Sequence, residues 1–375
     1  MPGLLPDVDP DGLLEYSVVY TDRALNHMSQ DFRQVMRDIS DTLKFVYHAD
    51  AVAVVPGSGT FGMEATARQF ATGQKCLVIR NGWFSYRWTQ IFEMGRIPSA
   101  ELVLKARATE EGSTPAFEPA PIEEVVSTIK SERPSVVFAP HVETSAGIIL
   151  PDEYIRRVGE AVHSVGGMFV LDCIASGTLW VDMAALEVDV LISAPQKGWS
   201  GSPCCALVMM NQSARARLDE TKSTSFACDL GKWLEIMEAY EKRGHAYHAT
   251  MPTDALTTFR GVMHEAGEDG FDVLKEKQQE LGTRIRTLLT SSGFRSVAAD
   301  GFGAPGVVVS YTDDPNLQNG SRFAALGIQI AGGVPLMCDE PEGFRTFRVG
   351  LFGLDKLNHI DRTAANFENA LGQLF

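Results

Sequence analysis

The sequence predicts an α/β fold with a large domain, built on a mainly parallel seven-stranded sheet, and a small C-terminal α+β domain. Two observations lead to this prediction. Between residues 50 and 210, short apolar runs alternate with longer amphipathic segments, which is typical of a parallel sheet covered by helices. After residue 230 the pattern becomes mostly helical, and short strands return near the C-terminus. At ~100–200 residues per domain, the 375 residues have room for two or three domains.

The large domain contains seven predicted strands and four predicted helices. The strands are at residues 51–55, 76–79, 101–104, 135–139, 168–171, 188–192 and 205–210. The helices are at residues 61–71, 84–94, 122–131 and 152–165, and the last of them follows Pro151, a common helix start. Residues 230–289 are mostly helical, with interruptions at Pro252 and Gly270.

The small domain begins near residue 269. Its predicted strands are at residues 306–311, 328–330 and 346–349, and its predicted helices are at residues 322–326 and 357–371. We therefore divide the chain into an N-terminal arm at 1–20, a large domain at 21–268 and a small domain at 269–375.

Composition and charge exclude several classes of protein. Hydrophobic residues make up 45% and charged residues 22% of the chain, which excludes a disordered or fibrous protein. The formal net charge is −15, so we expect neither nucleic acid nor a membrane as partner, because phosphate binding needs clustered cations. An enzyme for anionic metabolites is compatible with this charge, since a few local cations suffice.

The cysteines and the N-terminus indicate the compartment. The six cysteines have no regular spacing and no C-x-x-C pair, so we expect free thiols and neither a disulfide framework nor a zinc site. The histidines show no metal-ligand spacing either. Residues 1–20 contain no Lys or Arg, which does not fit a signal peptide, and no apolar run approaches the ~20 residues of a membrane span. We expect a cytoplasmic protein without a metal site.

The first candidate site is the glycine-rich turn at residues 56–62, Pro-Gly-Ser-Gly-Thr-Phe-Gly, between a predicted strand and a predicted helix. Small residues let backbone N–H groups approach an anion, the helix dipole favours phosphate, and the hydroxyls of Ser58 and Thr60 add donors. Its glycines also satisfy the G-x-G-x-x-G dinucleotide fingerprint, which normally pairs with an acidic residue after the next strand. Residues 80–82 read Arg-Asn-Gly instead, so NADP binding and a turn without a ligand are the weaker alternatives.

Two further candidate catalytic residues follow the ends of predicted strands. Asp172 follows the apolar run 168–171, at the edge where open parallel sheets bind ligands, although a helix-capping aspartate is an ordinary alternative. Lys197 follows the run 188–192, and a lysine there is costly unless it is paired or used covalently. Together with the glycine-rich turn, they supply an amine for a Schiff base, a carboxylate for a pyridinium nitrogen and a cradle for a 5′-phosphate. Those are the requirements of pyridoxal 5′-phosphate (PLP).

These motifs, with others, resemble the class V, fold-type I PLP-dependent aminotransferases, specifically the alanine/serine–glyoxylate group and the related 2-aminoethylphosphonate–pyruvate transaminases. The resemblance runs from about residue 50 to residue 350 and depends on the order and spacing of the motifs. These are the turn at 58–60, Asn-Gly-Trp-Phe at 81–84, His-Val-Glu-Thr-Ser-Ala-Gly at 141–147, Gln-Lys at 196–197, Tyr-His-Ala-Thr at 247–250 and Phe-Arg-Val-Gly-Leu-Phe-Gly at 347–353.

The resemblance implies the PLP-dependent transferase fold type I and a role for each matched residue. Lys197 is implied as the Schiff-base lysine and Asp172 as the partner of the pyridine nitrogen, and these two are the catalytic residues. Arg348 is implied to bind the substrate carboxylate. The further residues implied to bind the cofactor are Ser58, Gly59, Thr60, Phe84, Thr144, Ser145, Ile174, Gln196, Tyr247 and Thr250.

Several of these roles are more specific. Phe84 is implied to stack on the pyridine ring, and a hydroxyl of Thr144 or Ser145 to approach its O3′ side. Tyr247 and Thr250 are implied to reach the phosphate of the neighbouring subunit, in a homodimer with a shared active site. Ordinary alternatives stay open: Phe84 as a core residue, the 247–250 segment as a helix cap, and Arg348 in a structural ion pair.

One departure from the family concerns the substrate. The family usually begins with a Thr/Gly-Pro-Gly-Pro stretch near the substrate, whereas residues 10–22 here contain no such stretch. The segment 229–255 resembles the aminoethylphosphonate branch through Trp233, Met237 and Met251. We expect amino transfer from a small amino acid, such as alanine or serine, to glyoxylate or pyruvate, with 2-aminoethylphosphonate–pyruvate transamination as the alternative. In either case Lys197 acts as general base and acid.

Other chemistries on the same sequence are weaker alternatives. Cys338 lies in a predicted loop before Arg348, where a thiol of a PLP-dependent desulfurase or lyase could act, although a free cysteine is usually a small buried hydrophobe. An NADP-dependent oxidoreductase and a PLP-fold protein without activity are the remaining alternatives.

Overall fold

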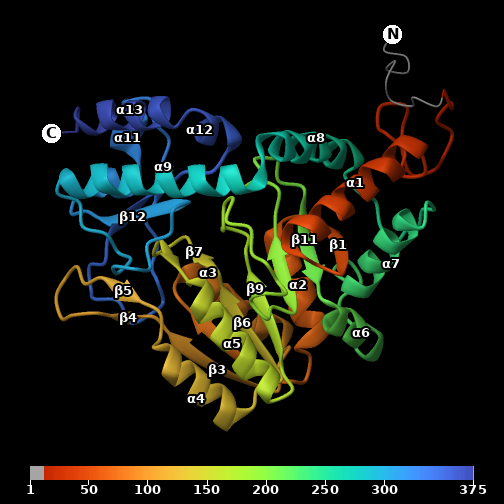
Figure 1. Ribbon diagram of the computed structural model, residues 1–375, viewed down its shortest axis with the longest axis horizontal. Coiled ribbons are helices and arrows are strands. Elements are labelled where there is room, and N and C mark those ends of the chain that lie inside the picture. The colour runs from red at the N-terminus through yellow and green to blue at the C-terminus, as the bar shows by residue number, and fades with distance from the viewer. Residues whose placement is uncertain (1–11, 375) are drawn as a thin grey trace.

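The computed structural model describes residues 12–374 and is built on a seven-stranded sheet in the order β1-β11-β10-β9-β6-β2-β3 (Figure 1). Its strands are β1 (Ala51–Pro56), β2 (Lys75–Arg80), β3 (Ala100–Lys105), β6 (Val136–Pro140), β9 (Met168–Asp172), β10 (Val190–Ser193) and β11 (Cys205–Met210). β11 runs antiparallel to both of its neighbours, and the other pairs are parallel. The predicted fold class, with its mainly parallel sheet, is therefore confirmed.

Helices cover this sheet, and α1 (Gln30–Tyr47) illustrates how an apolar helix face is buried. α1 buries a residue every three or four positions, and Ser29 caps it by accepting a hydrogen bond from the N–H of Phe32 at 3.1 Å. α2 packs against β11, α3 against β2, α5 against β9 and α7 against β1. The helices of this region are α1 (Gln30–Tyr47), α2 (Gly59–Phe70), α3 (Trp83–Gly95), α4 (Ile122–Glu132), α5 (Asp152–Ser164), α6 (Gln212–Glu220), α7 (Leu230–Glu241) and α8 (Thr253–Asp269).

The topology brings distant segments to one edge of the sheet. β11 is antiparallel to both β1 and β10, so β1 points the same way as the parallel strands. The segments that follow β1, β2, β6, β9 and β10 therefore all leave the sheet at its carboxyl edge, where open α/β sheets bind ligands. Two short strand pairs extend this region, β4 (Arg107–Ala108) with β5 (Phe117–Glu118) and β7 (Val142–Glu143) with β8 (Ile148–Ile149).

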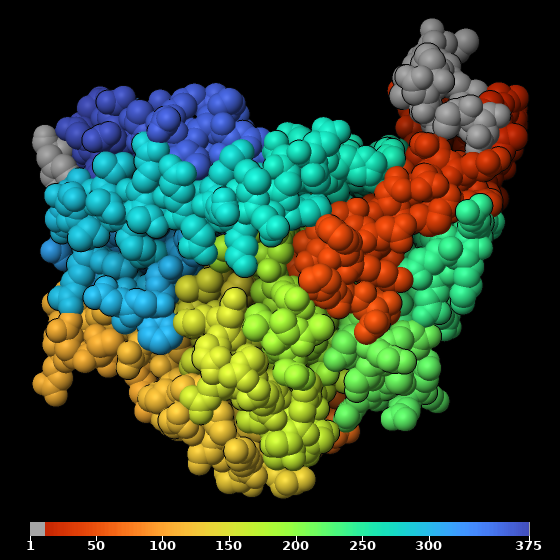
Figure 2. Space-filling view, viewed as in Figure 1, coloured from red at the N-terminus to blue at the C-terminus, as the bar shows by residue number. Residues whose placement is uncertain are grey.

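The C-terminal region forms a second, antiparallel sheet in the order β12-β14-β13, and its long helix α9 crosses the upper left of the view in Figure 1, between β12 below and α11–α13 above. In the space-filling view, this region covers the top of the large sheet region (Figure 2). Its elements are α9 (Phe271–Ser291), β12 (Val307–Tyr311), α10 (Pro315–Gln318), α11 (Ser321–Ala325), β13 (Ala331–Gly332), β14 (Thr346–Gly350), α12 (Leu354–Asn358) and α13 (Ile360–Leu371).

Three apolar clusters hold these regions together. One extends through the seven-stranded sheet and reaches Met263 of α8, and a second begins with Ala266 and Leu274 and fills the C-terminal region. A third joins the two, because it contains Val142 beside β6 and Val309 of β12. The C-terminal region therefore rests on the carboxyl edge of the large sheet through apolar contacts, and burial of this kind stabilises by roughly 25 cal/mol per Å².

Most predicted elements are confirmed to within two residues, and the exceptions have physical causes. Residues 328–330 are not a strand: they follow the end of α11, where the N–H of Ile328 bonds to Phe323 O. Ile328 and Ile330 pack on the second core, which explains the apolar positions that suggested a strand. The predicted helix 357–371 is divided, because His359 adopts a non-helical conformation between α12 and α13. The helices α1, α6 and α10 were not predicted.

Two predictions concern residues that lie partly outside the described range. The N-terminal arm at 1–20 and the segment 10–22 are described only from residue 12 onward. Within residues 12–374, no helix is both long and apolar enough to cross a membrane.

Candidate active site

Lys197 follows β10 and lies at the carboxyl edge of the sheet. Its Nζ is 5.1 Å from the centre of the Phe352 ring, which belongs to the C-terminal region. Burial lowers the pKa of Lys197, the nearby Arg348 lowers it further, and Asp172 opposes both effects. A lysine whose pKa is lowered in this way has a larger neutral fraction near pH 7 and can act as a nucleophile or base.

Asp172 is the last residue of β9, and parallel pairing with β10 sets it opposite Ile192. Its side chain is 7% exposed, and its Oδ1 accepts a hydrogen bond from the N–H of Ile174 at 2.9 Å. Burial raises the pKa of Asp172 to about 7, despite the opposing effects of that hydrogen bond, Arg87 and Lys197. Within residues 12–374 the carboxylate forms no ion pair, and a cation placed beside it would favour its ionised form.

The glycine-rich turn links β1 to α2. Ser58 is the N-cap residue of α2, but its hydroxyl makes no capping hydrogen bond and is left for another partner. A Cβ at Gly59 would lie 2.5 Å from Ile174 Cδ1, so only glycine lets Ile174 approach the turn this closely. The Thr60 Oγ1 accepts a hydrogen bond from Arg87 Nη1 at 2.8 Å.

Phe84 is the second residue of α3 and is positioned by a buried carboxylate. Glu143 accepts hydrogen bonds from the N–H groups of Phe84 and Ser85, at 3.2 and 2.9 Å, which neutralises free donors at the start of the helix. Ser145 Oγ donates to the same carboxylate at 2.7 Å and accepts from the N–H of Trp83 at 2.9 Å. The Ser145 hydroxyl is therefore occupied in holding α3.

These segments enclose a cavity of about 180 Å³. Arg87 also lines it, although the sequence analysis did not select this residue. The cavity is smaller than the roughly 300–1,000 Å³ of pockets for drug-sized ligands and suits a compact group. The predicted site residues that line it are Ser58, Gly59, Thr60, Phe84, Thr144, Asp172, Ile174, Gln196 and Lys197.

Four predicted site residues do not line this cavity. Ser145 lies behind it, as described above, so of the two hydroxyl candidates only Thr144 faces the cavity. Arg348 on β14 lies beside it: its Cζ is 5.5 Å from the Phe84 ring centre, and its Nε donates to Gly332 O at 2.8 Å. Tyr247 and Thr250 share a hydrogen bond of 3.2 Å, and Tyr247 is 53% exposed on the surface of this chain.

The sequence analysis missed two residues of the site. Arg87 lies three positions after Phe84 on the same helix face, so helical spacing was the signal that could have found it. Glu143 lies inside the motif at 141–147, but nothing in the sequence shows that its carboxylate reaches the start of α3. That contact joins residues 59 positions apart and exists only in the folded chain.

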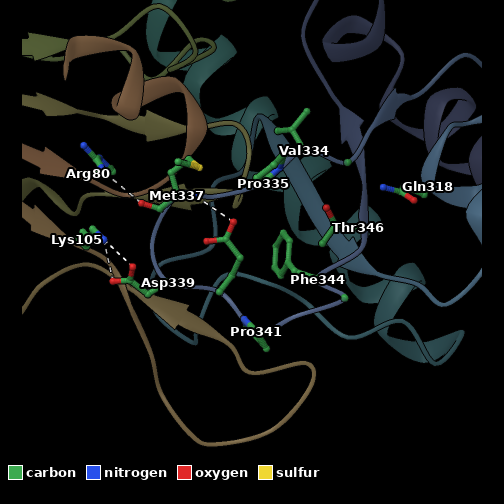
Figure 3. Close-up of a pocket in the computed structure, with 13 residues that line it drawn as sticks. Arg80, Lys105, Gln318, Val334, Pro335, Met337, Asp339, Pro341, Phe344 and Thr346 are labelled. Carbon is green, nitrogen blue, oxygen red and sulfur yellow. Dashed lines mark hydrogen bonds and ion pairs between the residues drawn. The ribbon is translucent and has the colours of Figure 1, made fainter. Parts of the chain in front are cut away.

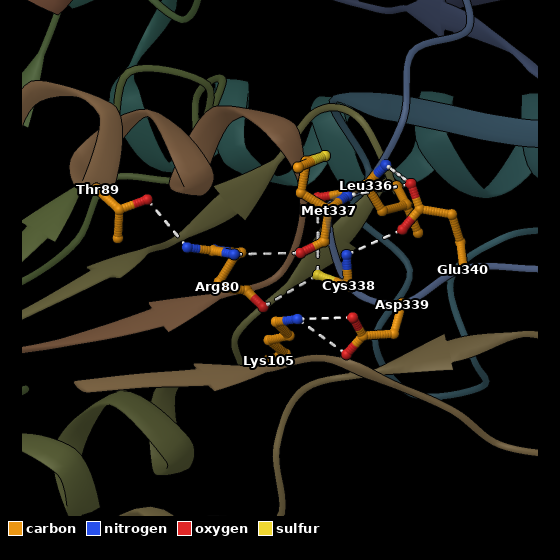
Figure 4. Close-up of polar contacts among 8 residues, drawn as sticks. All are labelled: Arg80, Thr89, Lys105, Leu336, Met337, Cys338, Asp339 and Glu340. Carbon is orange, nitrogen blue, oxygen red and sulfur yellow. Dashed lines mark hydrogen bonds and ion pairs between the residues drawn. The ribbon is translucent and has the colours of Figure 1, made fainter. Parts of the chain in front are cut away.

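Cys338 lies in a separate place, in the segment between β13 and β14. Its thiol is buried, its Sγ donates to Arg80 O at 3.4 Å, and burial raises its pKa to about 12 (Figure 4). A thiol needs thiolate character to act as a nucleophile, so this environment disfavours the desulfurase alternative. The six cysteines are all free and buried.

Two of the histidines, His141 and His163, have hydrogen-bond partners outside the cavity. The Nδ1 of His141 lies 2.8 Å from Ser176 Oγ, and burial lowers the pKa of His141 to about 4. His163 lies 2.9 Å from Asp189 Oδ2 through its Nε2. Among residues 12–374, no group of three or more His, Cys, Asp or Glu residues could hold a metal ion.

The comparisons with known proteins agree with this geometry. No family model matches the chain. The chain is 29% identical to a 2-aminoethylphosphonate–pyruvate transaminase of Paraburkholderia xenovorans, over 89% of this chain and 87% of that protein. It is 24% identical to the alanine–glyoxylate aminotransferase of Rattus norvegicus, over 93% of this chain and 82% of that protein.

The solved structures extend the comparison to the fold. The alanine–glyoxylate aminotransferase of a Nostoc species superimposes with a TM-score of 0.76, covering 92% of this chain and 88% of that one, at 22% identity. Both groups named in the sequence analysis therefore occur among the relatives, which confirms the predicted resemblance. The fold-type I architecture is confirmed as well.

Proposed function

We propose that this chain is a PLP-dependent aminotransferase that moves an amino group from a small amino acid, such as alanine or serine, to glyoxylate or pyruvate. One observation carries the proposal: a single cavity is lined by Lys197, by Asp172 and by the hydroxyl-bearing turn at Ser58 and Thr60. The relatives are named as aminotransferases, and aminotransferases of this fold type use PLP.

The residues present fit this cofactor. Besides the free hydroxyl of Ser58, the Oε1 of Gln196 is buried without a hydrogen-bond partner among the described residues, and Gln196 lines the cavity. A buried polar atom of this kind is costly unless a ligand or water satisfies it. Lys197 would hold the cofactor covalently, Asp172 would pair with its ring nitrogen, and Phe84 and Ile174 would contact its ring. When bound, PLP accepts the electron pair released at the substrate Cα.

The chain's own residues supply the proton transfer and the orientation. Lys197, with its lowered pKa, would take the proton from the substrate Cα and would return it as general acid on the cofactor side. Asp172 would keep the ring nitrogen of a bound cofactor protonated, because an ionised carboxylate in a buried site strongly stabilises a neighbouring cation. Arg348 presents its Nη groups for the substrate carboxylate, while its Nε is fixed by Gly332 O.

A half-reaction screen tests the proposal. The holoenzyme is mixed with single amines, namely alanine, serine, 2-aminoethylphosphonate and others, and the absorbance of the bound cofactor is followed without any keto acid. We expect alanine or serine to convert the cofactor to its amino form and release the matching keto acid. A protein that binds no PLP, or that reacts with no amine, would contradict the proposal.

2-Aminoethylphosphonate–pyruvate transamination is the second candidate, and a specific observation favours it. The two aminoethylphosphonate relatives are 29% and 27% identical to this chain, compared with 24% for the alanine–glyoxylate enzyme of the rat. In the same screen, conversion by 2-aminoethylphosphonate alone would establish this candidate and exclude the alanine or serine donor.

We further propose a homodimer in which Tyr247 and Thr250 contribute to the neighbouring subunit's site. Large apolar side chains are exposed in and near this segment and beside the turn: Phe226 is 77% exposed and Phe61 is 48% exposed. Exposed aromatic residues of this kind support an interface between subunits. Thr250→Val is expected to weaken PLP binding in the dimer, measured by titration of the apoprotein. A monomeric form that binds PLP equally well would contradict the shared site.

The domain division and the location are also proposals. We assign residues 21–268 to a large cofactor domain and residues 269–375 to a small domain, with an N-terminal arm at 1–20. The separate apolar cores support this division, since one ends near Met263 and the other starts with Ala266. The six free thiols support a reducing compartment, and we propose the cytoplasm.

A further inference from the structure

We propose that Arg87 binds the phosphate group of the cofactor, an assignment that rests on the proposed PLP-dependent function. Arg87 lies on α3, three residues after Phe84, and lines the small cavity. Its Nη1 donates to Thr60 Oγ1 at 2.8 Å, and its Cζ lies 5.2 Å from the centre of the Phe84 ring. The guanidinium therefore contacts the turn and the ring at once.

The charge of a phosphate monoester explains why the turn needs this residue. Such a group carries about −1.5 to −2 charges near neutral pH, whereas the start of a helix supplies only about +0.5. The dipole of α2 and the hydroxyls of Ser58 and Thr60 would leave most of that charge uncompensated in a buried site. A full positive charge at the turn is therefore required, since burying an unpaired anion is costly.

Arg87 is the cation placed to meet this need. Among the residues that line the small cavity, only Arg87 and Lys197 are basic, and Lys197 is required for the covalent link. Arg348 is outside the lining, and its Nε is bound to Gly332 O in the C-terminal region. Only Arg87 therefore combines a full charge with a contact to the glycine-rich turn.

The guanidinium is also available for a ligand. Within residues 12–374 no carboxylate forms an ion pair with Arg87, and its hydrogen bond to Thr60 uses a single N–H. By contrast, Arg68 on α2 is paired with Glu64 at 2.7 Å. An arginine fork with free N–H groups matches two phosphate oxygens, which a structural arginine paired with a carboxylate cannot do.

The test compares PLP with pyridoxal, which has the same ring and aldehyde but no phosphate. Apoprotein of the wild type and of Arg87→Gln, Arg87→Lys and Arg348→Gln is titrated with each compound, and dissociation constants are taken from tryptophan fluorescence and cofactor absorbance. Arg348→Gln is the matched control, because both arginines lie near the Phe84 ring at 5.2 and 5.5 Å. Pyridoxal binding also reports whether each variant retains a folded site.

We expect Arg87→Gln to weaken PLP binding by roughly tenfold to a hundredfold and to leave pyridoxal binding unchanged, as befits the loss of charge-assisted hydrogen bonds. Arg87→Lys should recover part of the preference for PLP, and Arg348→Gln should keep all of it. Equal weakening of both compounds in Arg87→Gln, or no weakening, overturns the assignment while the proposed function stands. A wild type that binds neither compound overturns the proposed function and this assignment with it.

Discussion

Two cavities of this molecule differ in size and in the state of their charged groups. The larger one, about 540 Å³, lies between the ends of β2 and β3 and the segment 333–345, which we call the strap (Figure 3). The smaller one, about 180 Å³, contains Lys197 and Asp172. Size alone would select the larger cavity as the site of the chemistry.

Lysine and carboxylate groups of the larger cavity already have partners, whereas Arg80 has only neutral partners among the described residues and its Nε is buried without a hydrogen bond. Lys105 forms an ion pair with Asp339 at 2.7 Å, and Arg80 donates to Thr89 Oγ1 at 2.9 Å (Figure 4). The carboxylate of Glu340 accepts three backbone N–H groups of the strap at 2.7, 3.1 and 2.9 Å. These contacts hold the strap, in which Met337 and Asp339 have positive φ angles of 62° and 60°.

The charged groups of the smaller cavity have weaker partners. Lys197 has an aromatic ring nearby, Asp172 has one backbone N–H, and Arg87 has one hydroxyl. Burial accordingly shifts the pKa of Asp172 and of Lys197 toward the neutral form. This difference supports the smaller cavity as the proposed active site, because Lys197 and Asp172 form no ion pair within residues 12–374, whereas Lys105 and Asp339 of the larger cavity form one.

The largest expected effect is that of Lys197→Ala. This change removes both the covalent link and the proton carrier, so turnover should fall by roughly a thousandfold or more. Borohydride treatment of the wild type, followed by mass spectrometry, should fix the cofactor on the peptide that contains Lys197. The matched lysine of the larger cavity is Lys105, and Lys105→Ala should change turnover by no more than about threefold. Equal losses in the two variants would break the distinction between the cavities.

Asp172→Asn should lower turnover by roughly a hundredfold and stabilise the apoprotein at the same time. Burial raises the pKa of Asp172 from 3.8 to about 7 in the folded chain, so ionisation disfavours the fold. The penalty is absent below about pH 4, grows as the pH rises, and is complete above about pH 7. Urea denaturation should show the variant more stable at pH 8, on the order of a few kcal/mol, with the difference shrinking toward pH 4.5.

The exposed Asp339 in the strap provides the control for this experiment. Asp339→Asn should show no such dependence, because its partner Lys105 is near the surface and the pair is solvated. A stability difference for Asp172→Asn that does not change between pH 4.5 and 8 would contradict the raised pKa.

Glu340→Gln tests whether the strap is stabilised by the ionised carboxylate of Glu340 and its hydrogen bonds to the backbone. Burial alone would raise the pKa of Glu340, but the backbone N–H groups of the strap lower it overall. The ionised carboxylate therefore stabilises the fold above about pH 4.5, and that stabilisation is lost as the pH falls through the lowered pKa. At pH 7 the variant should lose roughly 1–3 kcal/mol of unfolding free energy, measured in urea. The exposed neighbour Glu342, changed to Gln, should lose almost none.

Cys338→Ala should have the smallest effect on the chemistry. Because its thiol is buried and protonated, turnover should stay within about threefold of the wild type, and neither protein should release sulfide from cysteine. Both quantities can be measured in the same assay. Sulfide release by the wild type that disappears in Cys338→Ala would instead support the desulfurase alternative and give the strap a chemical role.

The sequence by itself determined the fold class and the strand ends that carry the candidate site. The apolar runs before Ser58, Asp172 and Lys197 are buried strands whatever the detailed packing, and parallel strands present their carboxyl ends at one edge. Hydrophobic periodicity predicted secondary structure less well where a segment packs against the core without pairing in a sheet. Residues 328–330 are an example, because they lie against the second core outside any strand.

Only the tertiary structure decided which polar groups meet and which remain free. The carboxylate of Glu143 accepts hydrogen bonds at the start of α3 and from the hydroxyl of Ser145. Of the two neighbouring hydroxyl residues, only Thr144 therefore lines the cavity. Arg87 meets Thr60 across a separation of 27 residues, and Cys338 is buried against Arg80. Hydrogen bonds and burial depend on distances between segments remote in the chain, which residue type and spacing do not specify. The sequence therefore proposed the reactive groups, and the fold decided which partners they have and in which direction their pKa values shift.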